Sequence, residues 1–335
     1  MTFAAPNHAV YQEKTNMMNV RKFTLLASLT IVGLCGPVLA ETAETAFITL
    51  GTNSGPIPNS KRSEPANLLR AGGQNILIDV GDAAAWQLSK AGVSLREINN
   101  VLLSHLHFDH TGGLFAFISQ RYQMIEASPV TIYGPPGTKA LVDSITTGIA
   151  AATRGGNNMR GFLQGGPADN INVTEIADGA QFTIGDVRLT AARNSHYVAT
   201  LGGDDPQAVS LAFRFDMPAR SIVYTGDTGP SEAVEKLAKG VDLLICEIMD
   251  PEIALKRVGA NRPGVPKQVT EMIGAHFRRE HVSPTEAGLM ATRAGAKKLV
   301  LTHNALPDEA IGDAGKAISQ NYKGPFVFAN DLDSF

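Results

Sequence analysis

The chain is poor in cysteine, with only two in 335 residues, Cys35 and Cys246. Cys35 follows directly on the N-terminal apolar stretch 23–34, so the chain beyond it holds a single cysteine. One cysteine can form no internal disulfide, and a fold held together by disulfides is therefore excluded. Cys246 stands in the apolar run 243–246, which favours a place in the core over a role as a metal ligand.

Clusters of basic residues are also absent. No three consecutive residues are basic. Residues 41–335 hold 26 basic and 31 acidic residues, a formal net charge of about −5. Proteins that bind nucleic acids use clustered Lys and Arg to neutralise phosphates. We therefore expect that nucleic acid is not the partner of this chain.

One apolar run lies near the N-terminus. The basic segment 19–22 is followed by an apolar stretch over residues 23–34, and the small-residue stretch 38–40 precedes Glu41. This tripartite pattern predicts a secretory signal peptide, whose apolar part is too short for a comfortable membrane span. We expect a periplasmic or secreted protein with no stable membrane insertion after the signal is cleaved.

The methionines near this segment suggest where the natural chain starts. A signal peptide begins close to its first methionine, so Met17 or Met18 is the expected start and residues 1–16 are an upstream extension. We therefore divide the chain into residues 1–40, the extension and signal peptide, and residues 41–335, a single domain.

Five of the seven histidines after residue 40 belong to one pattern. Residues 105–110 read His-Leu-His-Phe-Asp-His, and an apolar run enters this motif as a buried strand would. Because extended backbone sends alternate side chains to one side, His105 and His107 can share a metal ion, and Asp109 and His110 can face a second one. Imidazole and carboxylate in this ratio favour zinc or iron over calcium or copper.

Three further candidate ligands occur far along the chain. His196, Asp227 and His303 each stand at or just beyond the carboxyl end of a strand-like run. Together with the motif, this places the candidate ligands on one edge of a sheet core. The seven candidate ligands are His105, His107, Asp109, His110, His196, Asp227 and His303.

Strand-like runs are followed by helical runs in each half of the chain, which fits two sheets packed face to face with helices outside. We expect strands near 46–50, 66–71, 75–79, 100–104, 130–133, 182–191, 208–215, 221–225, 242–247 and 297–302. We expect helices near 83–92, 112–121, 137–150, 231–238, 266–279, 284–294 and 308–319. We expect long irregular loops that shape substrate access at 51–65, at 153–171 with Phe162 and Leu163 at its tip, and at 250–266.

The histidine motif and the ligands that follow it resemble the metallo-β-lactamase superfamily, from about Phe47 to the C-terminus. Two supporting stretches are 48–52, Ile-Thr-Leu-Gly-Thr, and 76–81, Ile-Leu-Ile-Asp-Val-Gly. The resemblance implies an α/β fold of the αββα sandwich type, in which two packed mixed β-sheets are flanked by helices. It also implies two zinc ions, with iron or manganese as alternatives. The residues implied on one ion are His105, His107 and His196. Those implied on the other are Asp109, His110 and His303, with Asp227 as the bridge.

Within that superfamily the chain is most similar to the ribonuclease Z branch, which includes secreted arylsulfatase-like relatives. That branch carries a His-Ser-Thr element, whose histidine serves the leaving group, at the place of the stretch 281–288 here. Its His-Glu-Ala-Thr element corresponds to 246–249, Cys-Glu-Ile-Met, so the glutamate is kept and the flanking histidine is not. The arm that grips transfer RNA is not recognisable. These departures argue against transfer RNA processing.

The candidate catalytic residues are Asp109, His281 and Glu247. Two metal ions can lower the pKa of a shared water and make it a nucleophile at neutral pH. His281 would protonate the leaving oxygen, and Glu247 would orient its imidazole. The alternative role of His281 is helix entry, ahead of a capping box at residues 283–286. His276 falls in a predicted helix, and no function is assigned to it.

We therefore expect an exported, binuclear zinc-dependent hydrolase of a small phosphate or sulfate ester, of the phosphodiesterase or arylsulfatase kind, with a homodimer left open. A lactone or β-lactam hydrolase is the alternative, because attack at a carbonyl needs no leaving-group acid. Oxidative chemistry on iron would use fewer ligands, and a binding protein without activity would have lost some of them. The ligand set alone does not separate the two hydrolases.

Overall fold

A computed structural model describes residues 45–124, 128–154, 165–197, 208–261 and 264–335. The signal-peptide prediction falls on residues 1–40, which lie outside the described residues, as do Phe162 and Leu163. Among the helices within the described ranges, none has both the length and the apolar character needed to cross a membrane.

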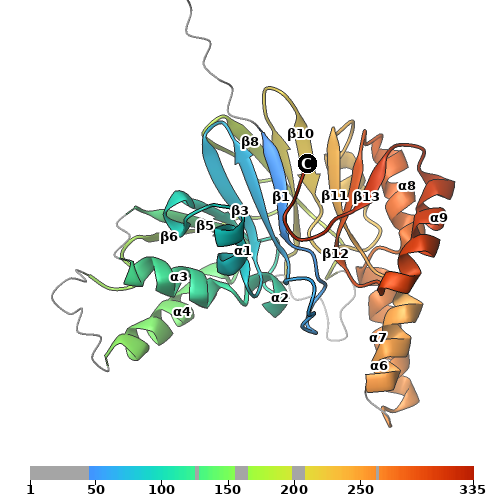
Figure 1. The fold of residues 1–335 in the computed structure, drawn as a ribbon, viewed down its shortest axis with the longest axis horizontal. Coiled ribbons are helices and arrows are strands. Elements are labelled where there is room, and N and C mark those ends of the chain that lie inside the picture. The colour runs from blue at the N-terminus through green and yellow to red at the C-terminus, as the bar shows by residue number, and fades with distance from the viewer. Residues whose placement is uncertain (1–44, 125–127, 155–164, 198–207, 262–263) are drawn as a thin grey trace, which may run out of the picture. The chain divides into compact units, whose positions relative to one another are not determined.

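Two seven-stranded mixed sheets form the body of the molecule (Figure 1). The first contains, in spatial order, β14 (Asp333–Ser334), β1 (Ala46–Gly51), β2 (Ala66–Ala71), β3 (Gln74–Val80), β4 (Asn100–Leu102), β5 (Val130–Gly134) and β6 (Ile171–Glu175). The second contains β13 (Phe326–Phe328), β12 (Leu299–Asn304), β11 (Leu243–Ile248), β10 (Ser221–Tyr224), β9 (Leu211–Asp216), β8 (Val187–Arg193) and β7 (Gln181–Ile184). In the first sheet the run β3 to β6 is parallel, and in the second the run β10 to β13 is parallel.

Helices cover the outer faces of the two sheets. In Figure 1, α3 and α4 lie below β5 and β6, α1 lies near β3, and α8 and α9 lie to the right of the strands. The helices of the first half are α1 (Ala84–Lys90), α2 (Phe108–Thr111), α3 (Leu114–Gln123) and α4 (Thr138–Thr153). Those of the second half are α5 (Glu232–Leu237), α6 (Pro251–Asn261), α7 (Lys267–Glu280), α8 (Pro284–Ala294) and α9 (Ile311–Asn321). Short 3-10 turns occur at Leu95–Glu97 and Asp308–Ala310.

The alternation of side chains along the strands builds three apolar layers. On β1, Phe47 packs between the two sheets, whereas Ile48 packs under the helices of the first half. The layer under the helices of the second half contains Met290 and Ile318 together with Cys246, which is buried as expected. Helix, sheet, sheet and helix therefore follow one another, and the predicted αββα sandwich is confirmed.

The prediction of a loop over residues 250–266 is wrong, because most of this stretch is helix α6, which packs against α7 (Figure 1). Pro251 stands at the first helical position, where a missing N–H costs nothing. The carboxylate of Asp250 accepts bonds from the backbone N–H groups of Glu252 and Ile253 and so caps this end. The proline that suggested a loop therefore starts a helix.

The secondary structure also differs from the predictions in three other places. The single strand expected at 182–191 is the hairpin of β7 and β8, turned at Gly185, whose φ is 55°. The loop expected at 153–171 ends earlier, because Ile171 begins β6. The C-terminal strands β13 and β14 were not predicted, since three and two residues are too short to show a period.

Candidate metal centre

Strand ends place the candidate ligands, as the sequence predicts. His105 and His107 follow β4, His196 follows β8, and Asp227 follows β10, while His303 is the next-to-last residue of β12. The candidate ligand atoms gather in two groups, within each of which the atoms lie within 4.8 Å of one another. One group holds His105, His107 and His196. The other holds Asp109, His110, Asp227 and His303. His281 lies within the same distance of His196 and Asp227, and these three residues form a third, overlapping group.

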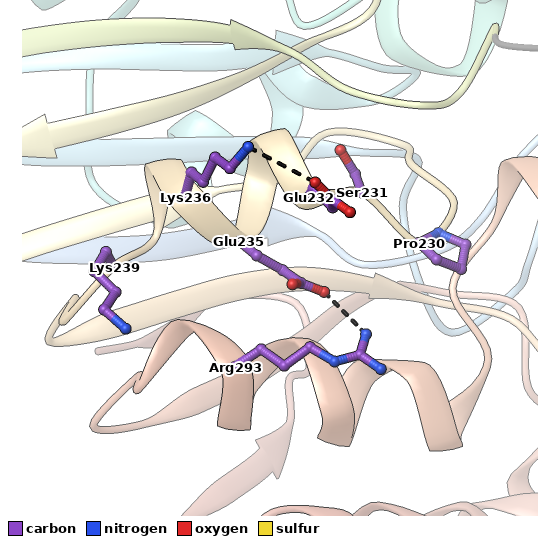
Figure 2. A pocket seen from close by; sticks show the side chains of 7 residues that line it. All are labelled: Pro230, Ser231, Glu232, Glu235, Lys236, Lys239 and Arg293. Atoms are coloured by element: carbon purple, nitrogen blue, oxygen red, sulfur yellow. Dashed lines mark hydrogen bonds and ion pairs between the residues drawn. The ribbon is translucent and has the colours of Figure 1, made fainter.

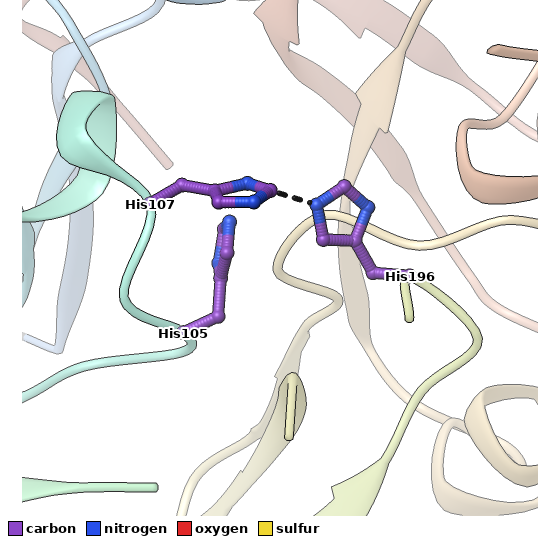
Figure 3. A group of neighbouring side chains, drawn as sticks. All are labelled: His105, His107 and His196. Carbon is purple, nitrogen blue, oxygen red and sulfur yellow. Dashed lines mark hydrogen bonds between the residues drawn. The ribbon is translucent and has the colours of Figure 1, made fainter. Parts of the chain in front are cut away.

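The first group consists of three imidazoles that converge on one point (Figure 3). Nδ1 of His107 lies 3.1 Å from Nε2 of His196. The ring centroid of His105 lies 4.7 Å from that of His107 and 4.9 Å from that of His196. Burial lowers the pKa of His105 well below its usual value and that of His196 to about 3. Both rings are therefore neutral at pH 7, which is the form that binds metal.

The carboxylate of Asp227, which belongs to the second group, also faces the histidines of the first. Its Oδ2 is 3.9 Å from Nε2 of His105, 4.0 Å from Nε2 of His196 and 3.3 Å from Nε2 of His303. Its Oδ1 is 3.2 Å from Nε2 of His110. Burial alone would raise the pKa of Asp227, but the neighbouring histidines hold it well below its usual value. Asp227 is thus the residue placed to bridge the groups.

The buried polar atoms at this site fit a bound cation. Nε2 of His105, Nε2 of His110 and Oδ1 of Asp227 are buried and make no hydrogen bond, although the last two atoms lie 3.2 Å apart. An unsatisfied buried polar atom costs roughly 1–3 kcal/mol, so several in one place call for a ligand. Neutral imidazoles and ionised carboxylates are donors that divalent metal ions accept. The residues present therefore fit the divalent metals that the resemblance implies.

Asp79, which was not predicted as a site residue from the sequence, supports the second group through His110. Its buried carboxylate accepts bonds from the backbone N and Oγ of Ser104 and from the hydroxyl of Tyr224, at 2.7, 2.8 and 2.7 Å. Oδ2 also lies 2.9 Å from Nδ1 of His110, so the other ring nitrogen faces the cluster. The signal in the sequence was a carboxylate inside the apolar run 76–80.

His281 and Glu247 form a buried pair beside the cluster. Nδ1 of His281 lies 2.8 Å from Oε2 of Glu247, whose Oε1 accepts a bond of 2.6 Å from the backbone N–H of Thr228. Burial would lower the pKa of His281, but the carboxylate of Glu247 raises it to about 9. Ser283 caps the N-terminus of α8, as the helix-entry alternative expects, and His281 precedes it by two residues. That alternative gives no reason for the contact between His281 and Glu247.

A second histidine–carboxylate pair, which was also not predicted from the sequence, lies on α7. Nδ1 of His276 is 2.8 Å from Oε2 of Glu280, one helical turn away. The backbone carbonyl of Glu280 lies 3.0 Å from Nδ1 of His196. The spacing of four residues was visible in the sequence, but nothing there placed this helix beside His196. His276 therefore lies at the cluster rather than on a remote surface.

A cavity of about 280 Å³ opens over the cluster. His107, Asp227, His276 and His281 are among its polar lining residues. Its apolar wall is formed by Pro56, Phe108, Met249 and Phe277. Phe108 is 87% exposed, although it stands between two candidate ligands. Candidate ligands, the candidate acid His281 and an apolar surface therefore line the same cavity.

A larger cavity of about 740 Å³ lies elsewhere, along α5 and α8 (Figure 2). Nη1 of Arg293 lies 3.1 Å from Oε1 of Glu235, and Nζ of Lys236 lies 3.7 Å from Oε2 of Glu232. Its lining charges therefore largely pair with one another. None of the candidate ligands lines it, and we assign it no chemistry.

The comparisons with known proteins agree with this fold and site. Residues 74–304 match the family model described as the β-lactamase superfamily domain. The chain is 31% identical over 257 residues to the ribonuclease Z of Mycobacterium avium (strain 104), covering 76% of this chain and 84% of that protein. The fold and the site define a metal-dependent hydrolase, and the chain belongs to the metallo-β-lactamase superfamily.

Solved structures support the fold. The metallo-β-lactamase fold protein YhfI from Bacillus subtilis aligns with a TM-score of 0.60 at 19% identity, over 87% of this chain and 98% of that one. The short form of human tRNase Z aligns with a TM-score of 0.58 at 20% identity, over 87% and 98%. The relatives named ribonuclease Z weigh against the expectation that nucleic acid is not the partner.

Proposed function

We propose that the chain is an exported, binuclear zinc-dependent phosphodiesterase that acts on a small phosphate ester. The observation that carries this proposal is the pair of His281 and Glu247 in the cavity over the cluster. A phosphate ester needs its leaving oxygen protonated or stabilised, whereas a lactone does not. The likeness to ribonuclease Z, which acts on RNA, favours phosphodiesters over sulfate esters.

The seven candidate ligands would hold the two ions in the groups described above. Nitrogen and oxygen donors in groups of three and four suit zinc, which binds in tetrahedral or five-coordinate sites. The chemistry that such ions supply when bound is the activation of water and the stabilisation of developing negative charge. Asp109 is also held by the loop after β1, where the backbone N–H of Gly55 donates to its Oδ2 at 3.1 Å.

The side chains of the cavity would handle the substrate and its protons. His281 is kept protonated by Glu247 and would give its proton to the leaving oxygen. Glu247 fixes the ring through Nδ1, so Nε2 is the nitrogen left for the substrate. Phe108 and Phe277 offer apolar surface to the organic part of the ester. Together these residues orient the ester, shield it from bulk water on one side and supply the proton.

A small substrate is proposed rather than RNA on two grounds. The chain has no run of three basic residues, and residues 41–335 carry a net negative charge. No lysine or arginine is among the residues that line the cavity over the cluster. Export is supported by the basic, apolar and small-residue pattern that precedes Glu41.

The decisive experiment is a substrate panel with zinc-loaded protein that begins at Glu41. The panel holds bis(p-nitrophenyl) phosphate, p-nitrophenyl sulfate, an aliphatic lactone, a cephalosporin and a precursor transfer RNA. We expect the phosphodiester to be hydrolysed with the highest kcat/KM. A preference for the lactone or cephalosporin would refute the phosphodiesterase assignment, and efficient cleavage of the RNA would refute the small substrate.

A further inference from the structure

A second cavity, of about 160 Å³, adjoins the cavity over the cluster. Gly55, Pro56, Met249 and Phe277 line both, so the two cavities share a wall. A molecule whose reacting group sits at the cluster can therefore extend into the second cavity. The second cavity lies between the loop after β1 and helix α6, the segment that the sequence analysis took for a loop.

Two arginines are the charged residues of this second cavity. Arg62 donates through Nη1 to the carbonyl of Asn304 at 3.2 Å and through Nη2 to that of Leu306 at 3.3 Å. Arg257 donates through Nη1 to the carbonyl of Ala305 at 3.2 Å. These bonds use only part of the donors of each guanidinium, which has five N–H groups. Both side chains are thereby tied to one backbone segment and brought to one cavity.

No carboxylate among the described residues is within ion-pair distance of either guanidinium. The nearby acids have other partners. Asp308 lies 2.7 Å from Nζ of Lys61. Asp331 accepts bonds from the Thr52 hydroxyl, the backbone N–H of Ser63 and the Gln87 amide.

The pKa of Arg62 agrees with a pair of arginine charges that nearby carboxylates balance only in part. Burial lowers the pKa of Arg62, and the positive charge of Arg257 lowers it further, while Asp308 and Asp331 offset part of this shift. Arg62 is half-buried and Arg257 is exposed, and two like charges that line one cavity are stabilised by a bound anion. A guanidinium offers paired donors whose spacing matches the oxygens of a carboxylate or a phosphate.

We propose that the second cavity is a subsite for an anionic oxygen group of the substrate, remote from the bond that is cleaved. This inference rests on the proposed function and narrows it to phosphodiesters with an apolar spacer and a terminal carboxylate or phosphate. Met249 and Phe277, on the wall between the cavities, contact the spacer. Arg257 and Arg62 bind the terminal group.

The test uses synthetic diesters in which p-nitrophenol is the leaving group and an alkyl chain of two to six carbons is the other substituent. The chain ends in a carboxylate, in its uncharged methyl ester or in a phosphate. Leaving group and reacting phosphorus are the same in all three series. We expect at least one chain length at which zinc-loaded protein prefers an anionic tail over the methyl ester by roughly 10- to 100-fold in kcat/KM, the range typical of charge-assisted hydrogen bonds. The carboxylate and phosphate series show which anion is preferred.

The variant is Arg257→Gln, which removes the guanidinium and its charge and keeps a polar side chain. Arg62 is left intact, because its bonds hold the backbone next to His303. Lys256→Gln is the matched control, since it removes the same charge from the neighbouring exposed position of α6. We expect Arg257→Gln to lower the ratio of anionic to uncharged kcat/KM about 10-fold, mainly through KM, and Lys256→Gln to leave the ratio unchanged.

Three results would overturn the inference. Equal rates on charged and uncharged tails at every chain length would refute the anion subsite, but they would not contradict the phosphodiesterase activity. An equal loss of preference in both variants would mean that net charge, rather than a built site, attracts the anion. Hydrolysis of none of the diesters would overturn the proposed function, and the subsite with it.

Discussion

Nδ1 of His281 lies 2.8 Å from Oε2 of Glu247, two residues that are 34 positions apart in the chain. The contact fixes the tautomer and the orientation of the ring, because the nitrogen bound to the carboxylate keeps its proton. The ring of His281 lies parallel to that of His303 at 6.3 Å between centroids. The candidate acid is thus held beside the seven candidate ligands, with its ligand atom within 4.8 Å of those of His196 and Asp227.

The first prediction concerns His281→Ala. If His281 protonates the leaving oxygen, the variant should hydrolyse diesters of poor leaving groups roughly 10²–10⁴-fold more slowly. Nitrophenyl diesters should lose much less, because their leaving group needs little protonation. The measurement is kcat/KM across a series of leaving groups of different pKa. Metal content serves as the control and should be unchanged.

Glu247→Gln should show a weaker form of the same selectivity, since Glu247 acts through the imidazole. The glutamine oxygen can still accept the bond from Thr228, so the backbone next to Asp227 should be kept. Equal losses on good and poor leaving groups would show that His281 is not the acid. Loss of metal from the His281 variant would mean that the ligand assignment itself is wrong.

The second prediction concerns Asp79→Asn. The asparagine keeps the size of the side chain but loses the charge behind His110, and residues that orient metal-bound histidines typically contribute 10- to 100-fold to metal affinity. We expect zinc affinity to fall by about that factor, measured by competition with a chelator. Tyr224→Phe, which removes one donor to the same carboxylate, should have a smaller effect. An unchanged zinc affinity in Asp79→Asn would show that the hydrogen bonds of Asp79 contribute to packing and not to metal binding.

The third prediction concerns the pH dependence of stability through Asp242. Its carboxylate lies 2.7 Å from Nζ of Lys297 and accepts bonds from the backbone N–H and hydroxyl of Ser221. The Lys297 contact, together with the Ser221 bonds, lowers the pKa of Asp242 to about 2. A lowered pKa stabilises the folded state above the unfolded pKa near ~4, and this contribution is lost as pH falls towards 2.

Thermal unfolding of wild type and Asp242→Asn from pH 7 to pH 3 tests this sign. We expect the variant to be less stable at pH 7 and the difference in Tm to shrink below about pH 4. The difference should also decrease at high salt, because Lys297 is largely exposed. A difference that is constant over the whole range would contradict a contribution from the ionised carboxylate of Asp242.

The candidate ligands could be predicted from the sequence because their signal is local. Each stands at the end of a strand-like run, and strand ends on one edge of a sheet meet in space whatever the details of packing. The same reasoning placed Cys246 in the core. Glu247 and His281 needed the resemblance to a known branch, since 34 residues separate two side chains that touch.

What the sequence did not reveal depends on tertiary contacts. Asp79 looked like part of a strand, because its partner Tyr224 lies 145 residues away. His276 lies four residues from Glu280, but only the packing of α7 puts it near His196. Helix α6 was missed because Pro251 was taken as a loop residue rather than as a helix start. The second cavity follows from that helix and could not be foreseen without it.

The fourth prediction concerns export. The pattern before Glu41 predicts cleavage after Ala40 and a mature protein outside the cytoplasm. N-terminal sequencing of protein from separated cell fractions of an expressing bacterium is the measurement. A version that starts at Met17 should be processed as efficiently as the full chain, which is the control for the upstream extension. A cytosolic product that retains residues 23–34 would contradict export and would strengthen the case for an intracellular nuclease.

The last prediction concerns metal content. Seven candidate ligands in two groups should bind about two zinc ions per chain, because three or four protein ligands and a water complete each site. Elemental analysis of gently purified protein measures this number. His105→Ala removes a ligand from the first group only, so we expect it to hold about one ion per chain, with the second group still loaded.

Chelation should lower Tm of the wild type, since ions that bind the folded state stabilise it by mass action. One tightly held iron per chain and no second metal would contradict the binuclear site, and with it the chemistry assigned to Asp227 as the bridge.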